Sequence, residues 1–153
     1  MQPEITIRVA DLMADGAALS RIPAEPGVYR LFHPARPVAR IGGTDLRGTL
    51  YIGKAKRLPS RLRQMQRSFA ATGTGREGHH VGAMRYNAAL GALGRDFPLS
   101  ALALDLYVHP GVKAAEEAET AMLIAYFREF GEVPPLNGTL KLYPGGELRD
   151  ELR

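Results

Sequence analysis

Two strand-like segments on either side of a long polar connection constrain the fold of this chain most strongly. Val28–Phe32 (VYRLF) alternates apolar and polar residues, and Thr49–Gly53 (TLYIG) is a second short apolar segment. The intervening His33–Gly48 is rich in proline, glycine and arginine. The pattern predicts two paired β-strands with an unusually long connection, and therefore a sheet that is mainly antiparallel.

Helical patterns follow these strands. Between Leu58 and Phe69, apolar residues recur at spacings of four, three and four, and the arginines lie off this stripe. Val81–Leu93 is a second helical candidate ended by Gly94, and Leu99–Val108 is apolar enough for a buried strand. Lys113–Phe130 is the longest expected helix, with acidic residues near its start and Gly131 at its end.

We therefore expect one α+β domain with a small central, mainly antiparallel three-stranded β-sheet flanked by α-helices. A length of 153 residues suits a single hydrophobic core. Residues 1–22 are expected to form an N-terminal extension, in which Glu4–Leu12 is an edge strand or an arm. Residues 23–140 form the domain, and the charged residues 141–153 form a tail.

Composition narrows the chemistry. The chain has no cysteine, which excludes disulfides, a thiolate zinc site and a cysteine nucleophile. It has no apolar segment of bilayer length, and its first residues are acidic where a signal peptide requires a basic flank. We therefore expect a cytoplasmic protein that does not span a membrane.

Basic residues are concentrated in one part of the chain. The net charge is +4, and seven lysines and arginines lie between Lys54 and Arg76 with no acidic residue among them. Such a segment favours a polyanionic partner, although a solvated helix face gives the same pattern.

The ordered motifs resemble those of one nuclease family. PGVYRLF (Pro26–Phe32) and LYIGKAKRLPSRLRQM (Leu50–Met65) look like the two halves of the GIY-YIG signature, and they are followed in the family's order by Glu119 and Asn137. The resemblance covers most of the chain. It implies a metal-dependent endonuclease that hydrolyses DNA phosphodiester bonds.

Phosphodiester hydrolysis requires that a water lose a proton, that phosphate charge be neutralised and that the leaving oxygen be stabilised. The resemblance assigns a Mg²⁺ (or Mn²⁺) ion to Glu119, because a single carboxylate with waters suits Mg²⁺. Glu116, one helical turn earlier, is an alternative ligand. Arg61 carries a planar guanidinium that fits the phosphate.

The remaining assignments concern the substrate and the water. Tyr29 and Tyr51 are expected to point to one face of the sheet, where they position or activate water, and Asn137 is expected to hold the site by hydrogen bonds. Substrate contacts are assigned to Lys54 and to four further basic residues, which are Arg57, Arg63, His79 and His80.

Two features depart from the family pattern. Many members carry histidine or tyrosine four residues after the helix arginine, where this chain has Met65. His79 and His80 are candidate substitutes, with an exposed loop pair as the alternative. The long connection, with Arg36, Arg40 and Arg47, would form either a DNA-contacting finger or a decorative loop.

Two other functions fit the same sequence. A catalytically weakened GIY-YIG-like DNA-binding module would bind DNA without cleavage, and a purely structural protein would not bind DNA. DNA repair, restriction and recombination fit the resemblance equally well. A second copy of the chain or an accessory protein is a candidate partner.

Overall fold

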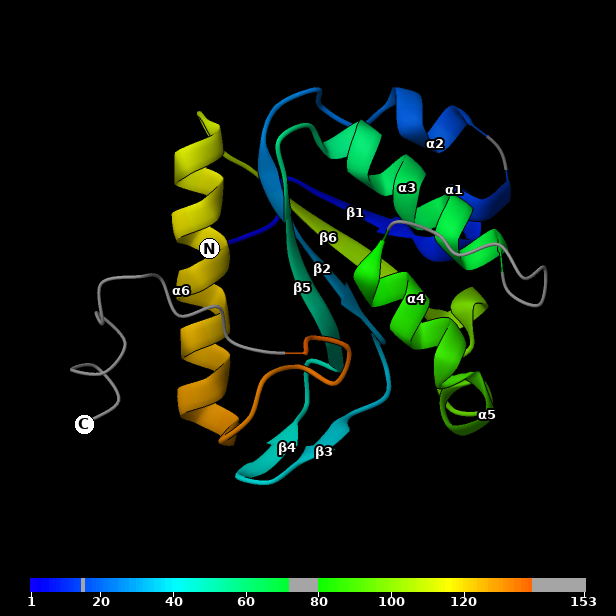
Figure 1. The fold of residues 1–153 in the computed structure, drawn as a ribbon, viewed down its shortest axis with the longest axis vertical. Coiled ribbons are helices and arrows are strands. Elements are labelled where there is room, and N and C mark those ends of the chain that lie inside the picture. The colour runs from blue at the N-terminus through cyan, green and yellow to red at the C-terminus, as the bar shows by residue number, and fades with distance from the viewer. Residues whose placement is uncertain (15, 72–79, 139–153) are drawn as a thin grey trace.

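The computed structural model describes residues 1–14, 16–71 and 80–138, which form three layers (Figure 1). A four-stranded sheet lies in the middle, helix α6 covers one face, and the remaining helices lie toward the other. The strands are β1 (Ile5–Arg8), β2 (Gly27–Phe32), β3 (Val38–Arg40), β4 (Gly43–Asp45), β5 (Thr49–Ala55) and β6 (Ala103–Val108). The helices are α1 (Val9–Ala14), α2 (Ala17–Ser20), α3 (Leu58–Ala70), α4 (Val81–Ala88), α5 (Leu90–Leu93), the 3-10 turn η1 (Leu99–Ala101) and α6 (Val112–Phe130).

The main sheet has the order β1-β6-β2-β5, and every neighbouring pair is antiparallel. This confirms the α+β class and the predicted pairing of β2 with β5. The sheet has four strands, however, where three were expected. The fourth is β1, whose alternating burial matches its pairing with β6 along all four residues.

The N-terminal segment is therefore part of the domain core. Val9 and Leu12 of α1 are fully buried in the same cluster as the sheet residues Leu104 and Leu106. The expected division at residue 22 does not separate two packing units, because residues on both sides of it share this cluster.

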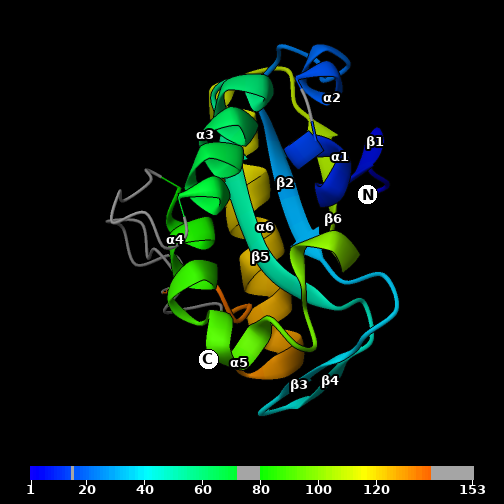
Figure 2. The same cartoon turned by 90° about the vertical axis from the view of Figure 1, so that its right-hand side faces the viewer.

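The two faces of the sheet bury different side chains. The α3 stripe of Leu58, Leu62, Met65 and Phe69 is buried against the sheet as predicted. On the other face, Val28 and Ile52 pack against Leu123 of α6. Figure 1 shows β5 between α6 on one side and α3 on the other, and Figure 2 shows α6 behind β5, so both helices flank this edge strand.

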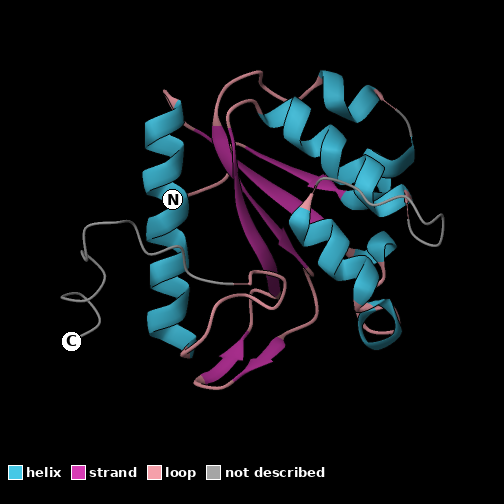
Figure 3. Cartoon of the chain, viewed as in Figure 1, coloured by secondary structure: helices cyan, strands magenta, loops and turns pink. Residues whose placement is uncertain are grey.

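The long connection between β2 and β5 contains a separate two-stranded ribbon, β3–β4, below the main sheet (Figure 3). The arginines of the connection bind acidic side chains elsewhere in the chain. Arg36 pairs with Asp96 at 3.5 Å, Arg40 with Glu132 at 3.0 Å, and Arg47 with Glu129 at 2.6 Å. The arginines that suggested a DNA-contacting finger thus anchor the ribbon to the domain.

The C-terminal half differs from prediction mainly at element boundaries. The expected helix over residues 81–93 is divided into α4 and α5 at Ala89, and η1 precedes the predicted strand β6. No helix among the described residues is long and apolar enough to cross a membrane. The tail 141–153 and His79 lie outside the described residues.

A candidate active site at the edge of the sheet

Tyr29 and Tyr51 point to the same face of the sheet, toward α3 and α4. In the β2–β5 register Tyr29 lies opposite Gly53 and Leu31 lies opposite Tyr51, which makes the two tyrosines diagonal neighbours. Their ring centres are 6.0 Å apart. Tyr29 is fully buried and Tyr51 is 8% exposed, so Tyr51 is the more accessible of the two phenols.

Two glycines make room for this pair. A Cβ at Gly53 would lie 2.5 Å from the Tyr29 hydroxyl oxygen and 2.6 Å from a Tyr51 ring carbon, and a Cβ at Gly82 would lie 2.9 Å from the Tyr51 ring. All three distances are too short for a side chain. Gly53 belongs to the motif recognised in the sequence, whereas Gly82, at the start of α4, was not singled out.

Arg61 reaches the tyrosines from the second turn of α3. Its Nε donates a hydrogen bond to the Tyr29 hydroxyl at 3.3 Å, and its Nη1 donates to Gln64 Oε1 at 2.8 Å. The side chain is half-buried, which fixes the guanidinium while leaving part of it accessible. The spacing from Tyr51 that singled out Arg61 in the sequence thus corresponds to direct contact with the tyrosine pair.

His80 approaches the same pair from the first residue before α4. It is fully buried, its Nε2 lies 2.7 Å from the Tyr29 hydroxyl, and its ring centre lies 5.4 Å from that of Tyr51. Its Nδ1 accepts a hydrogen bond from Ala83 N, which caps α4. His80 is therefore not an exposed loop residue, and it contacts Tyr29 from within the core.

Met65, four residues after Arg61, lies on the buried stripe of α3 and is fully inaccessible to solvent. It packs in the same core cluster as Tyr29 and Tyr51. Its role here is apolar packing, and the polar contacts to Tyr29 come from Arg61 and from His80.

Burial controls the ionisation of the aromatic groups. It raises the pKa of Tyr29, which the neighbouring Tyr51 raises further, and it also raises the pKa of Tyr51, although Arg61 opposes that second shift. Burial and the nearby Arg61 charge lower the pKa of His80 to about 3. The protein's own groups thus hold both phenols protonated and His80 neutral at neutral pH.

Glu119 lies on α6, in the layer opposite to Arg61. Its side chain is 18% exposed, and its Oε2 lies 3.5 Å from Lys54 Nζ, which also lies 3.4 Å from Glu116 Oε1. The negative charge of Glu119 acts on both Tyr29 and Tyr51 and raises their pKa values, so the carboxylate lies within electrostatic reach of the phenols. Glu119 thus contacts Lys54 and acts electrostatically on the two phenols at the edge strand β5.

Asn137 fixes the backbone of that strand. Its Oδ1 accepts from Ile52 N at 2.9 Å and its Nδ2 donates to Ile52 O at 2.8 Å, while Leu136 N donates to Leu50 O at 2.8 Å. The residue thus holds the strand that carries Tyr51 and Lys54 by hydrogen bonds of the kind expected for it. Arg85 of α4, which the sequence did not single out, secures the same segment by donating to Leu136 O.

A cavity of about 370 Å³ adjoins the second half of β5, between the N-terminal parts of α3 and α6. Arg61 lines it together with Lys54, Lys56 and Arg57, and Glu116 is the acidic residue in its wall. Lys56 and Arg57 are exposed. Arg61 is therefore accessible from a basic hollow. Arg63 is also exposed, but it does not line this cavity.

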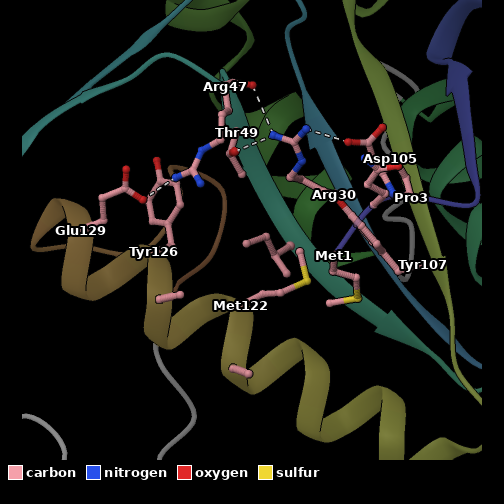
Figure 4. A pocket seen from close by; sticks show the side chains of 14 residues that line it. Met1, Pro3, Arg30, Arg47, Thr49, Asp105, Tyr107, Met122, Tyr126 and Glu129 are labelled. Atoms are coloured by element: carbon pink, nitrogen blue, oxygen red, sulfur yellow. Dashed lines mark hydrogen bonds and ion pairs between the residues drawn. The ribbon is translucent and has the colours of Figure 1, made fainter.

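A larger cavity of about 530 Å³ lies on the α6 face, and neither Tyr29 nor Tyr51 lines it (Figure 4). Its charged residues are paired: Arg30 binds Asp105 at 2.6 Å and Thr49 Oγ1 at 3.1 Å, and Arg47 binds Glu129. Since these cations are neutralised by acidic partners, the smaller basic cavity is the better place for an anionic substrate.

The side chains around Glu119 offer few protein ligands for a Mg²⁺ or Mn²⁺ ion. Among the described residues, no group of three or more histidine, aspartate or glutamate side chains converges, so the carboxylate of Glu119 would be the principal protein ligand. Hard oxygen ligands with several waters suit Mg²⁺. The ammonium of Lys54 lies 3.5 Å from this carboxylate, so a bound ion would share the carboxylate with Lys54 or displace it.

Five predicted residues, Tyr29, Tyr51, Arg61, Glu119 and Asn137, are thus brought to one strand and its flanking helices. Comparison with protein-family models finds none that matches the chain, and comparison with curated proteins also finds no match.

Proposed function

We propose that the protein is a metal-dependent endonuclease of the GIY-YIG type that hydrolyses DNA phosphodiester bonds. The observation that carries the proposal is the convergence of a guanidinium, two phenols and a carboxylate at one edge strand, beside a basic cavity. Groups from three layers of the fold meet there although they are 90 residues apart in sequence, from Tyr29 to Glu119.

Each group has a role that its surroundings favour. The substrate phosphate binds in the basic cavity, where Arg61 neutralises charge that develops during hydrolysis. Tyr51, protonated and slightly exposed, orients the phosphate or the attacking water by hydrogen bonding. Tyr29 is fully buried and acts by fixing Arg61 and Tyr51. Asn137 holds β5 in place, and Lys54, Arg57 and Arg63 contact the DNA backbone.

Glu119, with Glu116 as the neighbouring alternative, would hold the Mg²⁺ or Mn²⁺ ion. When bound, this ion supplies positive charge to the phosphate oxygens and lowers the pKa of a water. The raised pKa of Tyr51 favours hydrogen bonding over proton abstraction as the part that this residue plays.

The test is cleavage of labelled single-stranded, duplex, nicked and branched DNA with Mg²⁺, Mn²⁺ or EDTA. Arg61→Ala and Glu119→Gln are each compared with a matched variant on the same helix. Arg67→Ala removes an exposed α3 charge, and Glu117→Gln alters a glutamate that is 69% exposed and bound to Lys113. We expect metal-dependent cleavage that is lost in the first pair and retained in the second.

The second candidate, a DNA-binding module without turnover, is favoured by the exposed cations Lys56, Arg57 and Arg63, which would bind a backbone regardless of chemistry. Retention of DNA without cleavage under any metal condition would select it. Absence of both binding and cleavage would contradict both functions.

A further inference from the structure

The hydrogen bonds around His80 determine which of its ring nitrogens carries the proton. The backbone N–H of Ala83 can only donate, and it lies 3.1 Å from His80 Nδ1. Nδ1 of the neutral ring is therefore the acceptor, and the proton is on Nε2. At 2.7 Å from the Tyr29 hydroxyl, Nε2–H then donates to the phenol oxygen.

The backbone of His80 is fixed as well as its ring. The backbone N–H of His80 donates to Ser68 Oγ at 3.0 Å, and the side chain of Asn87 donates to Ser68 O at 2.7 Å. These hydrogen bonds connect the start of α4 to α3. His80 and Ser68 are fully buried. The ring therefore cannot turn to exchange its donor and acceptor without breaking the N-cap of α4.

Tyr29 consequently receives two hydrogen bonds. His80 Nε2 and Arg61 Nε both donate to its oxygen, at 2.7 Å and 3.3 Å. With both acceptor positions used, the phenol's own proton must point elsewhere. Tyr51 is the neighbouring phenol. Its ring centre lies 6.0 Å from that of Tyr29, and a Cβ at Gly53 would lie 2.5 Å from the Tyr29 hydroxyl oxygen and 2.6 Å from a Tyr51 ring carbon.

We propose that His80 is a positioning residue that, by donating from Nε2–H to Tyr29, directs the Tyr29 hydroxyl proton toward Tyr51 and so sets the orientation in which the Tyr51 hydroxyl meets the substrate phosphate. This inference rests on the proposed nuclease function. It assigns His80 no contact with DNA, because the side chain is fully buried. Arg61 of α3 and His80 at the N-cap of α4 thus act on one oxygen.

Two substitutions separate this role from helix capping. His80→Asn keeps an oxygen at the position of Nδ1 and so retains the N-cap, but it does not reach Tyr29. His80→Gln places an amide N–H near the position of Nε2 and so retains the donor to Tyr29. We expect His80→Asn to lower kcat on the order of tenfold or more, the effect of losing one such hydrogen bond, with little change in KM. His80→Gln should retain more activity than His80→Asn.

A double-mutant comparison tests the route through Tyr29. In a Tyr29→Phe background, His80→Asn should cause no further loss of kcat, because the acceptor of its hydrogen bond is already absent. Equal losses in both backgrounds would overturn the proposal. So would a His80→Asn variant with the kcat of the wild type.

The tautomer can be measured without any activity. Nitrogen-15 NMR of the imidazole should show a protonated Nε2 and an unprotonated Nδ1 in the wild-type protein at neutral pH. A protonated Nδ1 would overturn the inference while leaving the nuclease function intact. A wild-type protein that cleaves no DNA would overturn the proposed function and the catalytic part of this inference together.

Discussion

Burial of polar groups sets the chemistry of individual residues at the edge of β5. Tyr29, Tyr51 and His80 are almost entirely removed from solvent, and burial is the main cause of the pKa shift of each. Because burial disfavours the charged form, the three aromatic groups act as hydrogen-bonding groups. Arg61 therefore contributes the fixed positive charge of this cluster, and Glu119 contributes the negative charge.

His80 should make the fold sensitive to acid. Its pKa is about 3 in the folded protein and about 6.5 in an unfolded chain, so the unfolded state binds a proton first as the pH falls. The associated stability is present above pH 6.5 and is lost between about pH 6.5 and 3. Lowering the pH from 7 to 4 should cost about 3 kcal/mol through this residue.

Urea unfolding at pH 7 and pH 4 measures this effect, with His80→Asn as the comparison. Other groups contribute to the same acid-induced loss, among them Asp45, whose pKa burial would raise but which hydrogen bonds from Thr49 and Arg47 lower. These groups are unchanged in His80→Asn. The variant should therefore lose about 3 kcal/mol less than the wild type between the two pH values, and equal losses would contradict the shift.

Gly53→Ala should damage the site more than it damages the fold. The new methyl group would lie 2.5 Å from the Tyr29 hydroxyl oxygen and 2.6 Å from the Tyr51 ring, so both tyrosines must move. We expect a loss of about 1–3 kcal/mol in unfolding free energy and a larger relative loss of DNA cleavage. Gly91→Ala in α5, where a Cβ meets nothing within 4 Å, is the control. It should keep the unfolding free energy and the DNA cleavage of the wild type.

At the scale of elements, strand β5 organises the site because its two faces and its edge serve different purposes. Tyr51 points toward α3 and α4, Lys54 points toward the acidic residues of α6, and the backbone of Ile52 is bound by Asn137. One strand thus aligns groups from both helical layers. A shift of β5 along its length would displace all of them together.

Asn137→Asp tests this dependence. Asparagine both accepts from Ile52 N and donates to Ile52 O, whereas an aspartate would place a second acceptor against that carbonyl. We expect Asn137→Asp to lower the free energy of unfolding, measured with urea, by about 1–3 kcal/mol. Asn137→Ala introduces no repulsion and should lower it by less. A larger loss of unfolding free energy in Asn137→Ala than in Asn137→Asp would show that the hydrogen-bonding pattern is not what holds the strand.

Sequence patterns predicted the elements whose periodicity is set by one buried face. The α3 stripe, the α6 helix and the pairing of β2 with β5 all follow from such patterns. The fourth strand was underestimated because β1 is only half-buried and its partner lies about 100 residues away. His80 was recognised as a candidate, but its burial depends on contacts with Ser68 and Tyr29 that no local pattern encodes.

At the scale of the whole molecule, the basic side chains fall into two groups, those paired with an acidic residue and those exposed without such a pair among the described residues. The ribbon arginines Arg36, Arg40 and Arg47 each bind an acidic residue, and they hold β3–β4 against the body of the protein. Lys56, Arg57 and Arg63 instead lie exposed near the basic cavity, and no ion pair of theirs is found among the described residues. The net charge of +4 thus understates the local potential beside Arg61.

This division predicts which basic residues govern DNA binding. A cation that contacts phosphate releases a counterion, so each one contributes about 0.9 to the slope of log affinity against log salt concentration for duplex DNA. Replacing Lys56, Arg57 and Arg63 together by alanine should reduce the slope by about 2–3 and weaken binding to all duplex sequences alike.

Arg36→Gln provides the matched control, because it removes one positive charge whose partner, Asp96, lies 3.5 Å away. Fluorescence anisotropy with labelled duplex DNA across a salt series measures both slopes. An unchanged slope in the triple variant would place the DNA elsewhere on the molecule, whereas a comparable reduction per charge in Arg36→Gln would mean that net charge, and not the surface beside Arg61, determines binding.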